Sequence, residues 1–382
     1  MKTDQIFYKF NPGEKPVFDK EFSFVPDLIL AFGCPKAIQE SLITMGLRSR
    51  YPDAIITGCS TAGEINGTKV TDNSVVLSAI SFASTKLLFH SVALGEGIGS
   101  FEAGAGLVKK FEPDGLKHIF ILSDGLSVNG TELVTGIRSV LPKGVNVTGG
   151  LAGDGADFKQ TWVVQNNGLA SMNIITAIGF YGDAIQIGYG SMGGWDSFGI
   201  ERRVTRSVKN VLYEIDNLPA LALYKSFLGE KASELPASGL LFPLSIRSEH
   251  NNEPLVRTIL AIDEAAQSLT FAGDIPEGAF VKLMKANVNR LIEGAAGAAE
   301  ISIKPLKGEE PSFAILISCV GRKLVLKQLV EEEVEAVSEL LGGKTLITGF
   351  YSYGELAPFL QDARCELHNQ TMTITAFSEV LN

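Results

Sequence analysis

The sequence predicts an α/β fold in which duplicated sheet-and-helix units form two subdomains, with stacked sheets inside and helices outside. Three stretches, which begin near Leu28, Ile119 and Phe313, repeat one order. An apolar run is followed by a helix-length stretch and by a second apolar run that ends in a glycine-rich turn with a carboxylate. A repeat of this length indicates duplicated strand-helix-strand units. The composition agrees, because 382 residues that are 45% hydrophobic and 20% charged can bury the cores of two or three domains.

In each copy, two apolar runs flank a helix and a third run follows the turn. The predicted strand runs are 28–33, 55–64 and 74–80 in the first copy, 119–125, 145–154 and 173–178 in the second, and 313–321, 346–355 and 371–377 in the third. Helices are expected at 35–46, which opens with Pro35, and at 129–141. In the third copy, apolar residues at helical spacing predict a helix over 324–341.

The region between the second and third copies does not follow the strand-helix-strand order of the repeat. Strand-like runs there are 184–195, 202–215, 241–247, 255–262, 268–273 and 279–284, and helices are expected at 218–228 and 288–299. We place the domain boundary near 215–219, where the pattern changes. The sequence then divides into a lead-in at 1–27, a first domain at 28–216 and a second domain at 217–382.

Charge and hydropathy exclude several classes of function. A net charge of −10 argues against binding to nucleic acid or to an anionic membrane, because both need a dense positive face. No apolar run approaches the ~20 residues that span a bilayer, and the first residues lack the pattern of a signal peptide. The four cysteines are scattered without a CxxC pair, which suits a reducing compartment. We therefore expect a cytoplasmic protein with no membrane insertion.

Each copy carries a glycine followed by a carboxylate at the turn after its second run. The carboxylates are Glu64, Asp154 and Glu355, and the repeat predicts equivalent positions for them. A glycine at such a turn allows a positive φ or a close backbone approach. For Glu64 and Asp154, hydrogen bonds to their own turn explain the pattern as well as ligand binding does.

The third copy has the most groups that could hold a ligand. Arg322 follows its first strand, Tyr351 and Tyr353 flank its turn, and Asn369 precedes its last strand. If the strands align as the repeat predicts, these side chains and Glu355 converge at one end of the sheet. Such a set could hold a small zwitterion. The predicted ligand-binding residues are Arg322, Tyr351, Tyr353, Glu355, Asn369, Glu64 and Asp154.

A cysteine-dependent enzyme is the alternative from a different class of protein. Cys34 precedes a helix that starts with proline, where the helix dipole could lower a thiol pKa, and Cys59 lies in the turn before Glu64. Thiols at strand ends are more often inert small hydrophobes, and no histidine occupies a matching place in the motif. We therefore expect binding without catalysis.

Four motifs together resemble the FIST sensory domain. They are 58–64, 318–322, 349–355 and 369–371, and the resemblance covers an amino-terminal part at 28–213 and a carboxy-terminal part at 218–358. The resemblance implies an intracellular input domain of bacterial signalling that binds small ligands such as amino acids. It also implies a separate output partner, such as a histidine kinase of a two-component system or a cyclic-dinucleotide enzyme.

Some relatives in the family that the chain resembles are haem proteins that sense nitric oxide and control a partner kinase. A haem needs an axial side chain, and the imidazoles in the sequence are His90, His118, His250 and His368. His90 and His118 sit at the ends of apolar runs, where a core or edge histidine is expected, and His250 lies in a polar turn. His368 adjoins the 369–371 motif and is the candidate axial ligand. Haem is the cofactor that the resemblance suggests.

Overall fold

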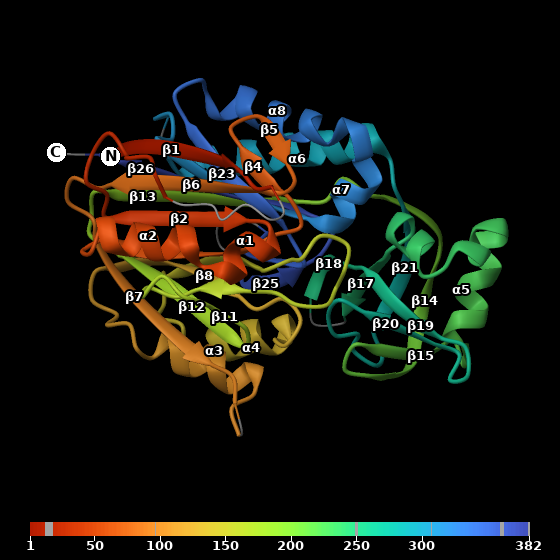
Figure 1. Ribbon diagram of the computed structural model, residues 1–382. Helices are drawn as coiled ribbons and strands as arrows, with labels where there is room; N and C mark the ends of the chain where they lie inside the picture. The colour runs from red at the N-terminus through yellow and green to blue at the C-terminus, as the bar shows by residue number, and fades with distance from the viewer. Residues whose placement is uncertain (12–17, 96, 249–250, 307, 360–362, 381–382) are drawn as a thin grey trace.

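The protein consists of a large body and a small lobe that projects from one side, at the right of Figure 1. The computed structural model describes residues 1–382 except 12–17, 96, 249–250, 307, 360–362 and 381–382. The body is made of three sheet-and-helix units, and the small lobe is inserted into the third. The parts are unit 1 (1–81), unit 2 (86–181), unit 3 (185–192 with 288–379) and the small lobe (196–285).

Unit 1 is a four-stranded sheet with two helices and a hairpin. Its elements are β1 (Lys2–Lys9), β2 (Leu28–Gly33), α1 (Pro35–Glu40), α2 (Leu42–Arg50), β3 (Ile55–Ser60), β4 (Glu64–Asn66), β5 (Lys69–Thr71) and β6 (Ser74–Ser81). The parallel strands β2 and β3 are joined through α1 and α2. Strand β6 runs antiparallel to β2, with β1 beyond it.

Units 2 and 3 repeat this order. Unit 2 contains β7 (Lys86–Ala93), α3 (Ser100–Val108), β8 (Leu116–Ser123), α4 (Gly130–Val140), β9 (Asn146–Leu151), β10 (Val163–Val164), β11 (Ala170–Ser171) and β12 (Ile174–Tyr181). Unit 3 contains β13 (Ile185–Met192), α6 (Val288–Ile303), β22 (Phe313–Cys319), α7 (Val320–Leu326), α8 (Val330–Leu341), β23 (Leu346–Ser352), β24 (Gly354–Pro358), β25 (Cys365–His368) and β26 (Met372–Glu379). The strand order β1-β6-β2-β3 corresponds to β7-β12-β8-β9 and to β13-β26-β22-β23. The predicted α/β fold of repeated sheet-and-helix units is confirmed.

Each unit gives a hairpin to the sheet of another unit. Hairpin β4–β5 of unit 1 pairs with β23 of unit 3, β24–β25 of unit 3 pairs with β9 of unit 2, and β10–β11 of unit 2 pairs with β3 of unit 1. Each donated strand meets the fifth residue of its acceptor strand, in the pairs Glu64 with Phe350, Glu355 with Gly150 and Val163 with Cys59. The exchange closes a ring, so the body has pseudo-threefold symmetry.

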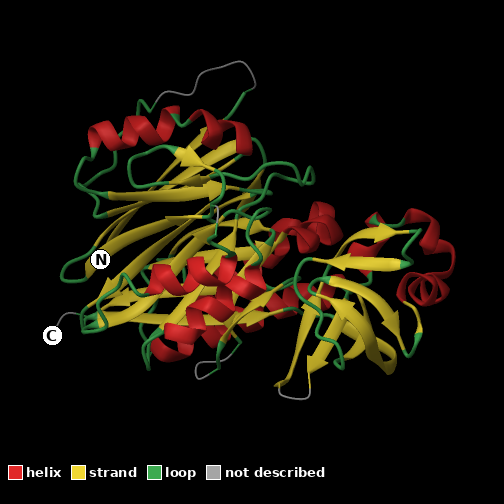
Figure 2. Ribbon diagram, turned by 90° about the horizontal axis from the view of Figure 1, so that it is seen from below, coloured by secondary structure: helices red, strands yellow, loops and turns green. Residues whose placement is uncertain are grey.

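The sheets of the three units meet in a shared core, and helices cover the outside of the body (Figure 2). Alternate residues of the first parallel strand in each unit point into this core, and each is at most 1% exposed. These residues are Leu30, Phe32, Phe120, Leu122, Ile315 and Ile317. A slip of one residue in any of these strands would turn its apolar side chains out of the core, so burial fixes the register.

The glycine that follows a threonine in the second parallel strand of each unit has a packing role. These glycines are Gly58, Gly149 and Gly349. A Cβ atom at Gly58 or Gly349 would lie 1.8 Å from a carbonyl oxygen of the neighbouring strand, and one at Gly149 would lie 1.9 Å away. No side chain fits at that distance, so close approach of two strands requires glycine here.

Two helices that apolar spacing predicts as continuous are broken, and the prediction of continuity is wrong. Ser41, with φ 56°, separates α1 from α2, and α2 runs on to Arg50. Lys327, with φ 53°, lies between α7 and α8, and α7 begins at Val320, before the predicted start. The apolar spacing continues across both breaks, so the period alone cannot reveal a left-handed residue.

The small lobe is a sheet with a core of its own. Its elements are β14 (Asp196–Val208), β15 (Val211–Ile215), β16 (Leu218–Pro219), α5 (Ala220–Leu228), β17 (Leu244–Ser248), β18 (Asn251–Arg257), β19 (Ile259–Asp263), β20 (Ser268–Phe271) and β21 (Phe280–Lys285). Leu212, Leu221 and Phe271 are buried in this core. Strand pairing in the lobe joins residues on both sides of the boundary predicted at 216/217, because β14 pairs with β21 and β15 pairs with β20.

None of the helices in the described ranges is long and apolar enough to cross a membrane. Helix α6 has 16 residues, fewer than the ~20 that a spanning helix needs.

Candidate functional site

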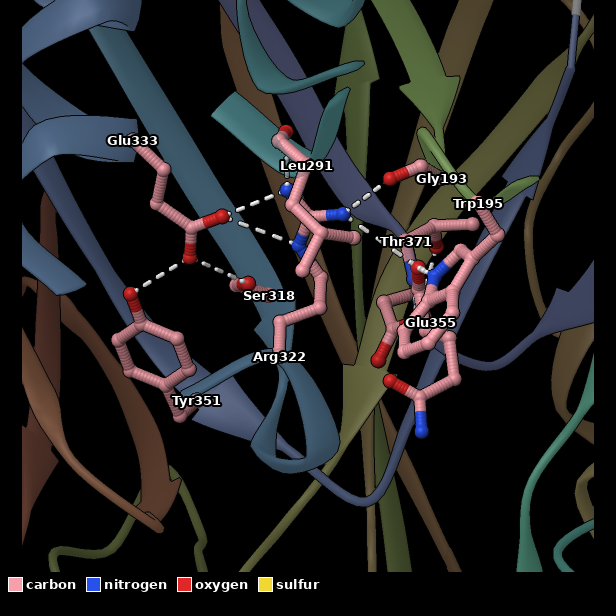
Figure 3. A network of polar contacts seen from close by, with 10 residues as sticks. Gly193, Trp195, Leu291, Ser318, Arg322, Glu333, Tyr351, Glu355 and Thr371 are labelled. Atoms are coloured by element: carbon pink, nitrogen blue, oxygen red, sulfur yellow. Dashed lines mark hydrogen bonds and ion pairs between the residues drawn. The ribbon is translucent and has the colours of Figure 1, made fainter. Parts of the chain in front are cut away.

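Arg322 lies in a buried polar network at the start of α7 (Figure 3). Its Nε and Nη2 donate to Oε2 of Glu333 at 3.0 and 2.6 Å, and both side chains are 0% exposed. The other oxygen of Glu333 accepts from Ser318 at 3.1 Å and from the Tyr351 hydroxyl at 2.7 Å. Nη2 also donates to the carbonyl oxygen of Leu291 at 2.8 Å. The guanidinium and the Tyr351 hydroxyl are thus engaged inside the protein.

Glu355 lies near Arg322, on the side away from Glu333 (Figure 3). Its Oε1 accepts from the Ser352 hydroxyl at 2.6 Å, and its Oε2 accepts from the hydroxyl and the N–H of Thr371 at 2.8 and 3.3 Å. Burial raises the pKa of Glu355 to about 8. The carboxyl group therefore ties the first strand of the donated hairpin to the start of β26.

Glu64 repeats this arrangement in unit 1. It accepts from the hydroxyl of Thr61 at 2.6 Å and from that of Ser74, at the start of β6, at 2.5 Å. Burial raises the pKa of Glu64 to about 7. The repeat thus correctly predicts that Glu64 and Glu355 are equivalent, and each links a hairpin to the last strand of its unit.

Asp154 does not occupy the equivalent position in unit 2, and the prediction that it does is wrong. The strand-pairing position of Glu64 and Glu355 is taken by Val163. Asp154 instead accepts hydrogen bonds from the N–H groups of 158–160, at 2.7 to 2.9 Å, and from the Tyr353 hydroxyl. In unit 2, 11 residues separate β9 from β10, against three between β3 and β4 and one between β23 and β24, so Asp154 falls in a loop and not in the donated strand.

Asp124 takes over the linking role in unit 2, and sequence reasoning missed it. It follows β8 and is 1% exposed. Its carboxylate accepts from the hydroxyl of Thr161 at 3.0 Å and from the N–H of Asn173, just before β12, at 2.8 Å. The Ser-Asp pair at the end of an apolar run was the signal that could have found it.

A pocket of about 320 Å³ opens between the body and the small lobe, and we call it the inter-lobe pocket. It lies where β8, β9, β22 and β23 end, which is the usual ligand position at the carboxyl ends of parallel strands. Its walls include 125–130 of unit 2, Cys319, Val320 and Tyr353 of unit 3, and Thr258, Leu260 and Phe271 of the lobe.

The predicted site residues divide between this pocket and the protein interior. Tyr353 lines the pocket, and so does Cys319 of the 318–322 motif. Arg322, Tyr351 and Glu355 meet in one buried region behind it, as the repeat predicts, whereas Glu64 lies in unit 1. The lobe residues of the pocket carry no motif, so the sequence could not indicate them. Direct ligand contacts of the buried residues stay a prediction.

Asn369 is 0% exposed, and neither its Oδ1 nor its Nδ2 has a hydrogen-bond partner among the described residues. The amide group of Gln370 is also buried without a hydrogen-bond partner among the described residues, and it lies against Gly321. Neither residue is among the described residues that line the inter-lobe pocket. The 369–371 motif thus places two unsatisfied amides beside the Arg322 network.

The two buried histidines do not fit a haem. His368 is 1% exposed, its Nε2 lies 2.8 Å from the carbonyl oxygen of Ala357, and burial lowers its pKa to about 4. His118 is also buried, with its Nε2 2.8 Å from the Thr148 hydroxyl. An axial ligand needs a free ring nitrogen facing the iron. His250 lies outside the described residues, and the haem hypothesis gains no support from the others.

Comparisons with known proteins agree with the motifs. The FIST N domain matches residues 27–218, and the FIST C domain matches residues 220–358. None of the curated proteins matches the chain. Among solved structures, the crystal structure of a cyanuric acid hydrolase from A. caulinodans aligns over 93% of this chain and 90% of that chain, with 9% identity and a TM-score of 0.30, a likeness too weak to carry an argument. FIST domains are sensory domains that bind small ligands in signalling proteins, and the chain belongs to the FIST family, as an N domain followed by a C domain.

Proposed function

We propose that the protein is a sensor that binds a small metabolite in the inter-lobe pocket and passes the binding signal to a separate partner. The partner is a histidine kinase or a cyclic-dinucleotide enzyme, and an amino acid is the ligand that the family resemblance suggests. One observation carries the proposal: the pocket takes its walls from unit 2, unit 3 and the small lobe together. A ligand that contacts all three can favour one arrangement of lobe and body over another.

The chemistry of the pocket supports binding rather than catalysis. Cys319 and Tyr353 are the titratable side chains among its described lining residues, and burial raises the pKa of both groups. Both therefore stay protonated near neutral pH, which makes them poor nucleophiles. Burial also raises the pKa of Cys34 to about 11 and that of Cys59. A cysteine-dependent reaction has no activated thiol among these groups.

Ligand binding can be tested on the full chain without knowing the ligand. Native mass spectrometry of the purified protein would detect a retained small molecule, and thermal melting against a panel of amino acids, organic acids and nucleobases would reveal one that stabilises the folded state. We expect the shift to disappear in Leu260→Trp, which fills the pocket from the lobe side. Leu218→Trp is the control, because Leu218 is exposed on the same lobe away from the pocket.

Two outcomes would overturn the proposal. One is an absence of any retained molecule together with a flat melting panel. The other is a thermal shift that survives in Leu260→Trp, which would place the ligand elsewhere. Signalling is tested with a candidate partner kinase, whose autophosphorylation should respond to the ligand with the unaltered chain and not with Leu260→Trp.

A further inference from the structure

The lining of the inter-lobe pocket is mostly apolar, with Ser127, Asn129, Asn210 and Thr258 among its uncharged polar residues. None of its described lining residues is charged. The rings of Phe158 and Tyr353 are stacked there, with centroids 4.4 Å apart and planes 13° apart, and Leu240 and Leu260 contribute apolar surface from the lobe. A ligand whose body is apolar would bury that surface favourably.

Thr258 of the lobe lines this pocket, and its side-chain hydroxyl lacks a partner. Thr258 is 4% exposed, and its hydroxyl has no hydrogen-bond partner among the described residues. Buried hydroxyl groups are nearly always paired, because an unpaired one keeps the cost of its lost hydration. A polar ligand atom in the pocket would supply the missing hydrogen bond.

The body side of the pocket offers backbone donors. Helix α4 has 11 residues and begins at Gly130, which lines the pocket. Within the described part of the chain, the N–H groups of Gly130 and Thr131 have no hydrogen-bond partner. The first N–H groups of a helix and its dipole together favour an anionic group at this end.

A buried positive charge lies behind the pocket wall. Arg257 is 3% exposed, and its guanidinium donates to backbone carbonyl groups, such as that of Leu367 at 2.9 Å. No carboxylate of the described residues lies within ion-pair distance of it. A Cβ atom on the lining residue Gly273 would be 2.7 Å from its Nε, so the charge abuts the wall. Burial lowers the pKa of Arg257 only to about 10, so it stays charged at neutral pH and favours an anion nearby.

Two carboxylates close to the pocket limit the charge that it can accept. Asp124 accepts from the N–H groups of Leu126 and Ser127, and Asp274 accepts from the side chain of Asn129. Neither aspartate lines the pocket, so an ammonium group would find no anionic partner on the described walls. Both repel negative charge on a ligand, so Arg257 and the first N–H groups of α4 can offset one carboxylate but not a second anionic group.

We propose that the inter-lobe pocket selects a small monocarboxylate with an apolar body and no ammonium group. Its carboxylate accepts hydrogen bonds from the start of α4 and from Thr258, and its body lies against Phe158, Tyr353 and Leu260. This inference rests on the proposed function, because it names the class of ligand for the same pocket. For this pocket it replaces the amino acid that the family resemblance suggests with an organic acid of similar shape.

Three matched probes test the class by isothermal titration calorimetry of the full chain at pH 7. They are 3-phenylpropanoate, its amide 3-phenylpropanamide, and L-phenylalanine, which adds only an ammonium group to the acid. We expect the acid to bind at least tenfold more tightly than either of the others. Thr258→Val should weaken its binding about threefold to tenfold, the effect of one hydrogen bond, and Thr258→Ser should restore it. Thr348→Val is the control, because that hydroxyl is also buried without a partner among the described residues but lies in β23, outside the pocket.

The outcomes separate this inference from the proposed function. Equal binding of the amide or of L-phenylalanine, or unchanged binding of the acid in Thr258→Val, would overturn the monocarboxylate class. If 3-phenylpropanoate does not bind but a panel metabolite does, and Leu260→Trp abolishes that binding, the class is wrong and the pocket remains the ligand site. If neither the probe nor any panel metabolite binds, both proposals fail.

Discussion

Replacing Arg322 with methionine should destabilise the body strongly, because the guanidinium is buried in an ion pair. The substitution leaves the carboxylate of Glu333 buried at 0% exposure, with Ser318 and Tyr351 as its remaining partners, and it strips the Leu291 carbonyl of a donor at 2.8 Å. Breaking a buried ion pair from one side costs about 3–5 kcal/mol. An unpaired carbonyl adds about 1–3 kcal/mol. We expect Arg322→Met to lower the free energy of unfolding by at least about 3 kcal/mol.

Urea unfolding followed by tryptophan fluorescence measures this loss, because Trp162 and Trp195 both lie outside the small lobe (196–285). Glu333→Met should also be costly. The double variant should lose less than the sum of the two single losses, since no isolated charge remains buried. Lys117→Met in β8 of the body is the control, because its ion pair with Asp183 is exposed and contributes at most about 1 kcal/mol. A loss below about 1 kcal/mol in Arg322→Met, or strict additivity in the double variant, would refute the reasoning.

Two further predictions concern the buried carboxyl groups and the strand glycines. Because burial raises the pKa of Glu64 to about 7 and that of Glu355 to about 8, the stability they contribute is fully present below pH 4.5 and is lost as the pH rises through 7 to 8. The melting temperature, measured between pH 5 and 9, should therefore fall less steeply with rising pH in Glu355→Gln than in the unaltered chain. An unchanged dependence on pH would contradict the raised pKa of Glu355. Gly349→Ala should destabilise the body by about 3 kcal/mol or more in urea, because its Cβ atom would lie 1.8 Å from a carbonyl oxygen. Gly106→Ala in α3, where the Cβ atom meets nothing within 4 Å, should instead stabilise the protein by up to about 1 kcal/mol. Equal effects of Gly349→Ala and Gly106→Ala would show that the close approach of the two strands does not require glycine.

Local patterns carried the prediction of the three units. Apolar runs and the glycine-carboxylate turns recur along the chain, and each reflects contacts inside one unit. The hairpin exchange could not be predicted in this way, because it joins Glu64 to Phe350 across most of the chain. The breaks at Ser41 and Lys327 were missed since apolar spacing carries no information on a single left-handed residue.

The candidate site was predicted in part for similar reasons. The repeat brought Arg322, Tyr351 and Glu355 to one region, but their burial depends on Glu333, which faces them from α8. That glutamate lies in a run of acidic residues that looks like a solvent-exposed helix face in the sequence. The lobe wall, with Thr258, carries no motif, because a pocket between an inserted lobe and the body arises only from packing.

The hairpin exchange also governs how many units such a body needs. A lone unit would have a hairpin with no acceptor strand and an acceptor edge with no hairpin, and unpaired edges of this kind attract other chains. Two units would still leave one hairpin and one acceptor edge unpaired, whereas three units pair every hairpin with an acceptor strand. A chain shortened by one unit would therefore self-associate, since only copies of itself could complete the circle.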